Sequence, residues 1–326
     1  MTTINYRQAI TEGIARAMRR DERVVFLGED VGEAGGAFKS TVGLIEEFGP
    51  GRVWDTPISE QAIIGAAMGA AMNGLRPIAE IMFSDFLSVC WDGIANEIAK
   101  ARYMTGGQLE VPLVIRTHNG AGMGFGAQHS QSLENMAMMV PGLKVVAPSN
   151  PADLVGLLAS AVDDPDPVLF FEHKNLFNDK GEVPDGDHCV PLGRAAIVRP
   201  GTDVTIVSLA AMVPVALEAA EALGGQGVSC EVLDLRCLAP LDLDAIVASV
   251  EKTSRLVVVE ENPRACGWGA EIASLVVEHA FWSLDGPIMR ITGAPVPVPF
   301  AANLEAAAIP SAAGVVEQMT AALASA

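Results

Sequence analysis

Short apolar runs alternate along this chain with longer segments that are apolar on one side only. Residues 6–20 place Ile10, Ile14 and Met18 on one side of a predicted helix, and the apolar run Val24–Leu27 follows as a predicted buried strand. The alternation continues to the end of the chain. It is typical of α/β proteins, in which helices cover both faces of mostly parallel sheets. We therefore expect an α/β fold with two mostly parallel three-layer α/β/α domains.

The predicted elements fall into two groups separated by a polar segment. Residues 173–191 are rich in glycine, proline and aspartate, which is typical of a linker or a surface excursion. We predict domains at 1–175 and 194–326, joined by a linker at 176–193. The other strands expected are 77–82, 111–116, 143–148, 168–172, 203–209, 230–235, 255–261 and 287–291. The other helices expected are one that follows Phe86 and runs through Arg102 and those at 151–162, 211–223, 241–250, 269–283 and 312–324.

One predicted helix is unusual because it carries no charge after its first turn. Pro57 ends an extended segment, since the residue before a proline avoids helical geometry, and Ser59 is a good N-cap. Small side chains then recur at near-helical spacing, so we expect a buried helix that packs closely against its own fold or another chain. Glu60, in the first turn, is the only charge between Asp55 and Arg76. The small residues are Gly65, Ala66, Gly69 and Ala70.

Glu60 has two interpretations. A lone carboxylate in a buried helix is costly unless it has a partner. The helix dipole and the free N–H groups of the first turn supply one such partner. The alternative is that Glu60 is a buried proton acceptor for a bound heterocycle. The residues alone leave both interpretations open.

Four further residues are candidates because of their place in the predicted fold. Glu29 and Asp30 end the first apolar strand and Phe86 lies just past the strand 77–82, and ligands collect at the carboxyl ends of such strands. The alternatives are a solvated turn for the two acids and a core position for the phenylalanine, which could otherwise stack on a flat ring. His129 lies in a loop of glycine and polar residues, where an imidazole either faces solvent or reaches a substrate.

Composition narrows the class of protein. The 326 residues contain 21 lysines and arginines against 40 aspartates and glutamates, a net charge of −19, which argues against nucleic-acid binding and gives no reason to expect a membrane as partner. The five cysteines form no C-x-x-C pair and indicate reduced thiols. There is no apolar signal region and no run of roughly 20 apolar residues, so we expect a soluble cytoplasmic enzyme or enzyme subunit.

Two glycine-rich stretches match no nucleotide-binding motif. Residues 32–36 and 120–126 fit neither the P-loop nor the G-x-G-x-x-G fingerprint. We therefore expect no phosphate cradle in this chain.

Several motifs, in order along the chain, resemble one enzyme family. They are Thr56–Glu60 with the small-residue helix, the sequence A-Q-H-S-Q at 127–131, and Val232–Asp242. Together they resemble the β subunit of thiamine-diphosphate-dependent 2-oxo acid dehydrogenase E1 components, a family that includes pyruvate, branched-chain 2-oxo acid and acetoin dehydrogenases. The resemblance covers nearly the whole chain. It implies transketolase-like domains, one binding the pyrimidine of the cofactor and one C-terminal.

The resemblance also implies roles for four residues. The glutamate matching Glu60 hydrogen-bonds N1′ of the cofactor's aminopyrimidine and drives the tautomer that deprotonates the thiazolium carbon. The acid matching Glu29 supports that glutamate, and the ring matching Phe86 packs on the aminopyrimidine. The histidine matching His129 handles protons in the active site and in acyl transfer to the lipoyl group of the E2 acyltransferase.

A cluster of acids near residue 164 is either an ordinary solvated turn or a cation-binding site. Acids around prolines usually form a solvated turn. Some members of the family hold a structural potassium ion here, and hard oxygen ligands suit such a cation. The positions that the resemblance implies are the backbone carbonyls of Leu113 and Ala161 with Asp164 and Asp166.

The chain lacks the family's diphosphate-binding half. That half carries a G-D-G motif and an asparagine that helps to hold Mg²⁺, and Asp185–Asp187 in the predicted linker is not that motif. We therefore expect an α subunit to bind the diphosphate and Mg²⁺, in a heterotetramer of two α and two β subunits. The expected reaction starts from a pyruvate-like 2-oxo acid or acetoin. The alternatives are a split transketolase, a split 1-deoxyxylulose-phosphate synthase, or a non-catalytic assembly scaffold.

Overall fold

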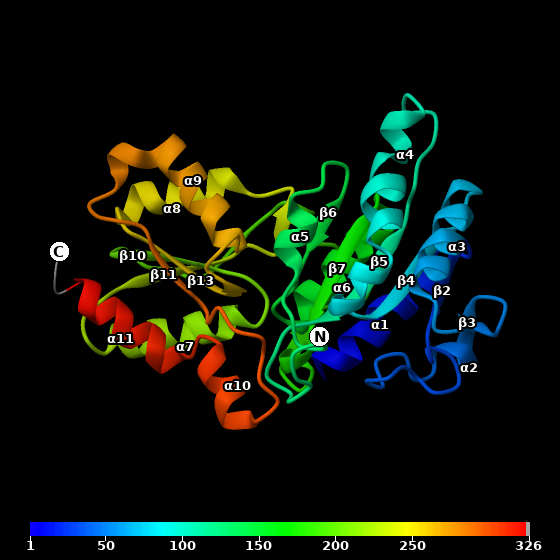
Figure 1. The fold of residues 1–326 in the computed structure, drawn as a ribbon, viewed down its shortest axis with the longest axis horizontal. Coiled ribbons are helices and arrows are strands. Elements are labelled where there is room, and N and C mark those ends of the chain that lie inside the picture. Colours follow the sequence, from blue (N-terminus) through cyan, green and yellow to red (C-terminus); the bar gives the residue numbers. More distant parts are fainter. Residues whose placement is uncertain (324–326) are drawn as a thin grey trace. The chain divides into compact units, whose positions relative to one another are not determined.

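The chain folds into two compact units in a computed structural model that describes residues 1–323 (Figure 1). Unit 1 consists of Met1–Asn119 and Met136–Leu192, and unit 2 consists of Gly120–Asn135 and the residues from Gly193 onward. The predicted α/β fold with mostly parallel sheets is confirmed. Residue 324, the last of the predicted helix 312–324, lies outside the described residues.

Unit 1 is built on parallel strands in the order β6-β7-β5-β4-β2-β3. Its strands are β1 (Thr2–Asn5), β2 (Val24–Gly28), β3 (Val53–Asp55), β4 (Arg76–Phe83), β5 (Val114–Asn119), β6 (Lys144–Val146), β7 (Val168–His173) and β8 (Lys180–Val183). Its helices are α1 (Tyr6–Arg20), α2 (Leu44–Phe48), α3 (Glu60–Met72), α4 (Ala99–Met104) and α6 (Pro151–Asp163), with short helices η1 (Ser84–Val89), η2 (Gly93–Ile98) and η3 (Lys174–Leu176). Helix α5 (Glu134–Met138) follows the segment that belongs to unit 2.

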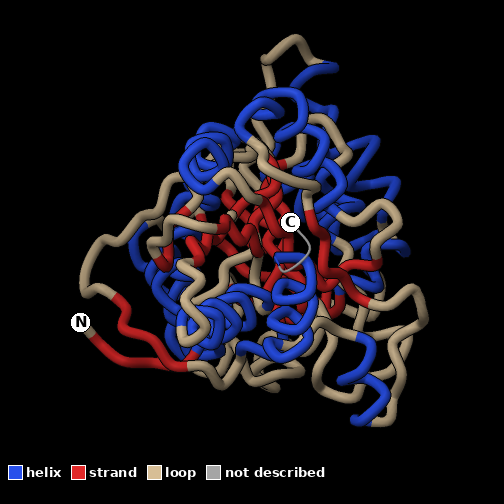
Figure 2. The backbone as a smooth tube through the Cα atoms, turned by 90° about the vertical axis from the view of Figure 1, so that its left-hand side faces the viewer, coloured by secondary structure: helices blue, strands red, loops and turns tan. Residues whose placement is uncertain are grey.

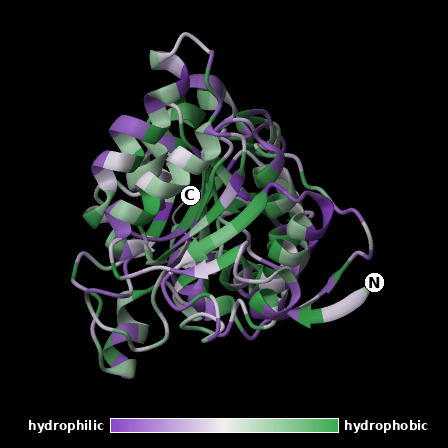
Figure 3. Cartoon of the chain, turned by 90° about the vertical axis from the view of Figure 1, so that its right-hand side faces the viewer, coloured by the Kyte–Doolittle hydropathy of each residue, from purple (hydrophilic) through white to green (hydrophobic). Residues whose placement is uncertain are grey.

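Helix α1 shows how local chemistry sets these bounds. The Asn5 side chain accepts the Gln8 N–H at 2.8 Å, and the Gln8 side chain accepts the Asn5 N–H at 3.0 Å. This reciprocal capping box starts the helix at Tyr6. Gly13 then lets α1 approach α6, because a Cβ there would lie 2.9 Å from Leu158. Figure 3 shows strands of the interior mostly in the colour of hydrophobic residues.

Unit 2 has a second sheet, in the order β14-β13-β10-β11-β9, in which only β9 runs antiparallel to its neighbour. Helices α8 and α9 lie on one side of these strands and α7 and α11 on the other (Figure 1). The strands are β9 (Ala196–Arg199), β10 (Val204–Ser208), β11 (Cys230–Asp234), β12 (Cys237–Ala239), β13 (Leu256–Pro263) and β14 (Met289–Gly293). The helices are α7 (Met212–Gly224), α8 (Leu243–Thr253), α9 (Trp268–Ala280), η4 (Phe281–Ser283), α10 (Ala302–Ala308) and α11 (Ala312–Leu323).

Two segments differ from the pattern-based predictions. The helix expected after Phe86 and through Arg102 begins later than predicted: a 3₁₀ helix spans Ser84–Val89, and a π-helical turn at Gly93–Ile98 then continues into α4. Gly93 opens the π-helical turn against α3, where a Cβ would lie 3.1 Å from Gln61 and 3.2 Å from Ile64. The segment predicted as a linker contains β8, which pairs antiparallel with β1 beside the N-terminus (Figure 2).

Among the described residues, no helix combines the length and the apolar character that crossing a lipid bilayer requires.

Candidate active site

Three neighbouring parallel strands of unit 1 end at one edge of the sheet. Strand β2 lies between β4 and β3, and all three run in the same direction. Glu29 follows β2, Glu60 follows β3 by a short loop, and Phe86 lies on η1 directly after β4. The sheet therefore brings these three predicted residues to the same carboxyl edge, where ligands bind in open α/β sheets.

Glu60 is the first residue of α3 and is 8% exposed. Ser59 occupies the predicted N-cap position, but its side chain makes no capping hydrogen bond. No described residue donates a hydrogen bond to the Glu60 side chain. Its charge lies at the positive end of the helix dipole, which is a weaker stabilisation than a donor would give. Glu60 is thus mostly buried, and no described residue supplies the hydrogen-bond partner that a purely structural role would provide.

Glu29 is a second buried carboxyl group at this edge. It is 6% exposed, and its Oε1 atom has no hydrogen-bond partner among the described residues. Burial raises the pKa of Glu29, and the negative charges of Glu60 and Asp30 raise it further. The charge of Glu60 acts on Glu29, so the two carboxyl groups are close enough to interact. A bound molecule that donates hydrogen bonds would suit this pair.

Phe86 and Cys90 complete the edge. The Cys90 thiol donates to the Phe86 carbonyl at 3.8 Å, and burial with the charge of Glu60 raises the pKa of Cys90 to about 12. Cys90 therefore connects the turn that carries Phe86 to the region of Glu60. The half-buried Phe86 ring meets Phe83 edge to face, with the ring centroids 5.6 Å apart. A flat ligand ring has an aromatic neighbour here.

The glycine-rich loop after β2 binds the chain's own groups. The Gly32 N–H donates to Asp55 at 2.6 Å, and the Gly36 N–H donates to the Asp30 carbonyl at 2.8 Å. These two donors are therefore already used by the chain itself.

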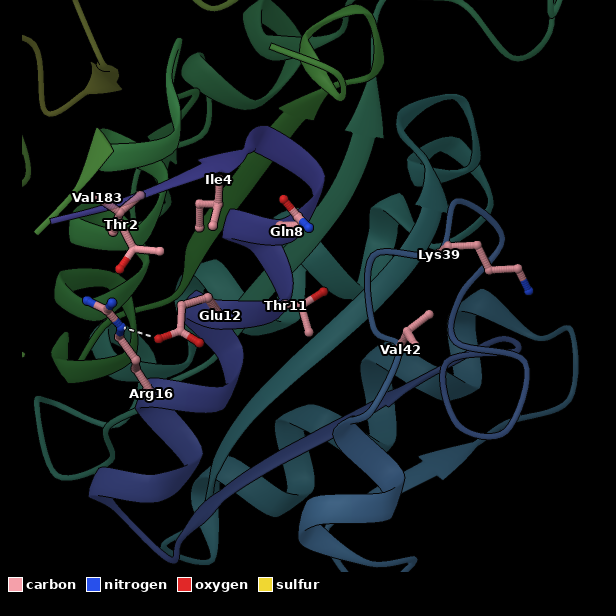
Figure 4. A pocket seen from close by; sticks show the side chains of 9 residues that line it. All are labelled: Thr2, Ile4, Gln8, Thr11, Glu12, Arg16, Lys39, Val42 and Val183. Carbon is pink, nitrogen blue, oxygen red and sulfur yellow. Dashed lines mark hydrogen bonds and ion pairs between the residues drawn. The ribbon is translucent and has the colours of Figure 1, made fainter. Parts of the chain in front are cut away.

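A hollow beside α1 is not a comparable site. Figure 4 shows Arg16 turned towards Glu12 and Lys39 pointing away from both. Arg16 binds Glu12 at 2.6 Å, and Lys39 donates to the Ala34 carbonyl at 2.6 Å. The cations that line this hollow are therefore committed to the protein itself.

Comparison with known proteins identifies the two domains of the chain. Residues 2–180 match the transketolase pyrimidine-binding domain, and residues 193–315 match the transketolase C-terminal domain. The β subunit of acetoin:2,6-dichlorophenolindophenol oxidoreductase from Bacillus subtilis is 50% identical over 321 residues, covering 94% of each chain. The β subunit of the pyruvate dehydrogenase E1 component from Rickettsia felis is 47% identical over 314 residues, covering 96% of each chain.

This chain belongs to the family of pyruvate and acetoin dehydrogenase E1 β subunits. The predicted resemblance is thereby confirmed, and with it an oxidoreductase subunit of the thiamine-diphosphate-dependent type. A solved structure titled "Split gene transketolase, inactive beta4 tetramer" covers 98% of this chain and 99% of its own, with a TM-score of 0.81 and 23% identity. That likeness shows the transketolase-like fold.

His129, which the resemblance predicts to handle protons, lies in unit 2. It is half-buried, and its N–H donates to the Gly126 carbonyl at 3.4 Å, closing a turn. Glu261 and Glu305 bind the backbone of the surrounding segment 120–135. Sequence reasoning found no residue with a chemical role in the second domain and so missed both carboxylates. Their signal was an acid in a mostly apolar setting, which is too common to be specific.

The residues predicted to bind potassium lie together at the opposite, amino-terminal edge of the unit 1 sheet. The Leu113 carbonyl accepts the Val168 N–H at 2.9 Å, and the Ala161 carbonyl accepts the Asp164 N–H at 3.4 Å. The Asp164 carboxylate is bound by the Lys144 ammonium at 2.5 and 2.6 Å, and Asp166 is bound by Arg102 at 2.9 Å. The chain thus supplies cations for both acids, and a potassium ion here stays a prediction.

A buried ionic network crosses the middle of the same sheet. Arg116 binds Glu80 on one side and Glu172 on the other, and all three side chains are fully buried. His118 donates from Nδ1 to the Met82 carbonyl at 2.6 Å, because the Arg116 guanidinium donates to its Nε2. Burial and the charge of Arg116 lower the pKa of His118, which is therefore neutral. Charged residues inside apolar strand runs were the sequence signal for this network.

Proposed function

We propose that this chain supplies the aminopyrimidine half of a thiamine diphosphate site in a heteromeric E1 component. An α subunit supplies the half that binds diphosphate and Mg²⁺, in a heterotetramer of two α and two β subunits. The substrate is acetoin or a pyruvate-like 2-oxo acid, and the acyl group passes to the lipoyl arm of an E2 acyltransferase.

The observation that carries this proposal is the state of Glu60. Its carboxylate is buried at the start of an uncharged helix, lacks a donor among the described residues, and lies near a second buried carboxyl group. Such a group is costly in the free protein. A heterocycle with a ring nitrogen that shares a proton with Glu60 would offset that cost.

Each residue of the edge has a role in this proposal. Thiamine diphosphate, when bound, supplies a thiazolium carbon that adds to the substrate carbonyl and accepts the electrons of the bond that breaks. Glu60 exchanges a proton with N1′ of the aminopyrimidine, which is general acid–base work. Glu29 supports Glu60 as the second carboxyl group at this edge. Phe86 packs on the pyrimidine ring.

His129 is proposed to act in the second half of the reaction. An imidazole can both give and take a proton, which the acyl transfer to the lipoyl group requires. His129→Ala should therefore slow acylation of the lipoyl group more than it slows electron transfer to an artificial acceptor dye.

The surface of α3 supports an α partner. Ile63, Ile64 and Ala67 are buried, whereas Gly65 and Ala66, which were expected to pack closely, are exposed in the single chain. A Cβ added at Gly65 or Gly69 would meet nothing within 4 Å. This side of an uncharged helix is apolar and open, which is typical of surfaces that obligate partners cover.

We assign magnesium binding to the α subunit because the D-G-D sequence of this chain is engaged in contacts within the chain. Asp185 of the one D-G-D sequence pairs with the N-terminal ammonium of Met1 at 2.5 Å, and the Gly186 carbonyl accepts from Arg16 at 3.0 Å. The described residues contain no group of three or more His, Cys, Asp or Glu side chains that could hold a metal ion.

Glu60→Gln in the reconstituted heterotetramer tests the proposal. Glutamine keeps the shape of the side chain but cannot accept the proton, so turnover should fall by about a hundredfold or more. Turnover would be measured with acetoin, pyruvate and 2-oxoisovalerate and a dye acceptor, and sugar phosphates would be assayed in parallel. Native mass spectrometry would confirm that the tetramer still forms. Glu46→Gln is the matched control, since Glu46 is an exposed acid in the first turn of α2.

The outcomes separate the alternatives. Normal turnover in Glu60→Gln would refute the proposed role of Glu60. A heterotetramer that binds no thiamine diphosphate in calorimetry would indicate a scaffold. Activity only with sugar phosphates would indicate a split transketolase or synthase.

A further inference from the structure

The glycine-rich segment 120–126 forms an anion-binding loop around a carboxylate of the same chain. Gly122 and Gly124 have positive φ angles of 102° and 69°. Their N–H groups point to one acceptor: Gly122 donates to Glu305 Oε1 at 2.8 Å, and Gly124 donates to Oε2 at 2.9 Å. Backbone N–H groups that converge in this way form a nest for an anion. Here the anion is the side chain of Glu305 on α10.

A second carboxylate holds the two ends of the same loop. Glu261 Oε1 accepts the Ala121 N–H at 2.8 Å and the Ser132 hydroxyl at 2.7 Å. The Gly120 N–H closes the base of the loop by donating to the Gln131 carbonyl at 3.2 Å. His129 lies between these anchors. Every residue in this arrangement belongs to unit 2.

The charge of Glu305 matters as well as its shape. Glu305 is 4% exposed, and both of its oxygens accept from backbone N–H groups. Hydrogen bonds to an ionised acceptor are stronger than neutral ones. A glutamine at this position offers only one acceptor oxygen. Its NH₂ group, a donor, would face the backbone N–H groups, which are also donors. Glu305→Gln should therefore loosen the loop even though the side chain keeps its volume.

We propose that Glu305 is a positioning residue that latches the loop carrying His129, with Glu261 as the second anchor. The glycines at 122 and 124 are required because the latch needs N–H groups at left-handed positions. The latch itself is independent of the proposed function, and only its consequence for catalysis rests on the role proposed for His129.

The first test is hydrogen exchange of peptides covering 120–132 in the reconstituted heterotetramer. Glu305→Gln and Glu305→Ala should speed exchange of the Gly122 and Gly124 amides by about tenfold to a hundredfold, the range expected for losing hydrogen bonds to a charged acceptor. Glu317→Gln is the matched control, because Glu317 is an exposed acid on α11 and its loss makes the same change in net charge. It should leave exchange of this segment unchanged.

The second test separates positioning from general damage. Glu305→Gln should lower acylation of a lipoyl domain more than it lowers dye reduction, in the same direction as His129→Ala, whereas a purely structural defect would lower both alike. Unchanged exchange in Glu305→Gln would overturn the latch. Faster exchange with both half-reactions normal would overturn the positioning role.

Two further variants keep the test decisive. If Glu305→Gln does not fold, Glu261→Gln should release the Ala121 amide and give the same pattern of exchange and acylation, and its failure to do so would overturn the proposal. If His129→Ala leaves lipoyl acylation unchanged, the proposed function of His129 fails, while the exchange result still decides the latch.

Discussion

The two edges of the unit 1 sheet carry acidic side chains in opposite states. At the carboxyl edge, Glu29 and Glu60 are buried, and no described residue donates a hydrogen bond to Glu60. At the amino edge, Asp164 holds Lys144 at 2.5 Å and Asp166 holds Arg102 at 2.9 Å. The same kind of group is thus satisfied by the chain at one edge and left unsatisfied at the other.

This difference separates structure from function. Folding selects against a buried charge without a partner, because its desolvation is not compensated. Where the chain supplies the partner, the acid is explained by stability alone. Where it does not, a molecule that binds later can supply the partner. Mutations should therefore lower stability at the satisfied sites and activity at the unsatisfied ones.

The largest loss of stability is expected where the chain's own pairing is fully buried. Arg116→Met leaves the Glu80 and Glu172 carboxylates in the core without a cation. Breaking a buried pair in this way costs about 3–5 kcal/mol. The measurement is the free energy of unfolding from urea denaturation.

The control for this prediction removes the orphaned charges. Adding Glu80→Gln and Glu172→Gln to Arg116→Met should recover part of the lost stability, since neutral side chains are less costly to bury. A loss of only about 1 kcal/mol in the single variant, typical of an average substitution, would contradict the prediction.

The comparison also shows what a sequence can and cannot predict. Helix α1 and strands β10 and β11 were predicted to within a residue or two because their signals are local: apolar periodicity and apolar runs. The ribbon of β1 and β8 was missed because it pairs Thr2 with Val183, and neither strand has an apolar run of its own. The break in the helix after Phe86 depends on contact with α3, which no local pattern encodes.

The candidate site divides in the same way. Glu60 stood out because it is alone in an uncharged stretch, which is visible in the sequence. Lys144 as partner of Asp164, and Glu305 as partner of Gly122, depend on folding that brings distant residues together. Motifs therefore located the residues, but only coordinates distinguish satisfied acids from unsatisfied ones.

A smaller loss is expected at the amino edge. Lys144→Met removes the cation from Asp164, and because both side chains are partly exposed the cost should be about 1 kcal/mol. Lys180→Met is the control, since Lys180 is exposed on β8 and its loss should change stability by less than about 0.5 kcal/mol. If the predicted potassium ion binds here, the loss will be smaller in KCl than in NaCl. Equal losses of stability in KCl and NaCl would indicate that Lys144 and Arg102, and no potassium ion, are the partners of Asp164 and Asp166.

The smallest change in stability, with the opposite sign, is expected for Glu29→Gln. Burial, Glu60 and Asp30 raise the pKa of Glu29 above its ordinary value of 4.5. A carboxyl group whose pKa rises on folding contributes stability below its ordinary pKa and loses that contribution as the pH rises through the folded-state pKa. At pH 7 the wild-type chain therefore carries a cost that glutamine removes. The variant should be as stable as the wild type or more stable, and its turnover with an α partner should fall.

The pH dependence makes this last prediction decisive. Urea denaturation of both chains between roughly pH 4 and pH 7 should show the advantage of Glu29→Gln growing as the pH rises. Asp164→Asn, measured in parallel, should instead be less stable than the wild type at pH 7, because it gives up a cation that the chain supplies. If Glu29→Gln also loses stability at pH 7, then Glu29 has a stabilising partner in the free chain. The two edges would then not differ in kind, and the argument that an unsatisfied carboxylate marks the cofactor site would fail.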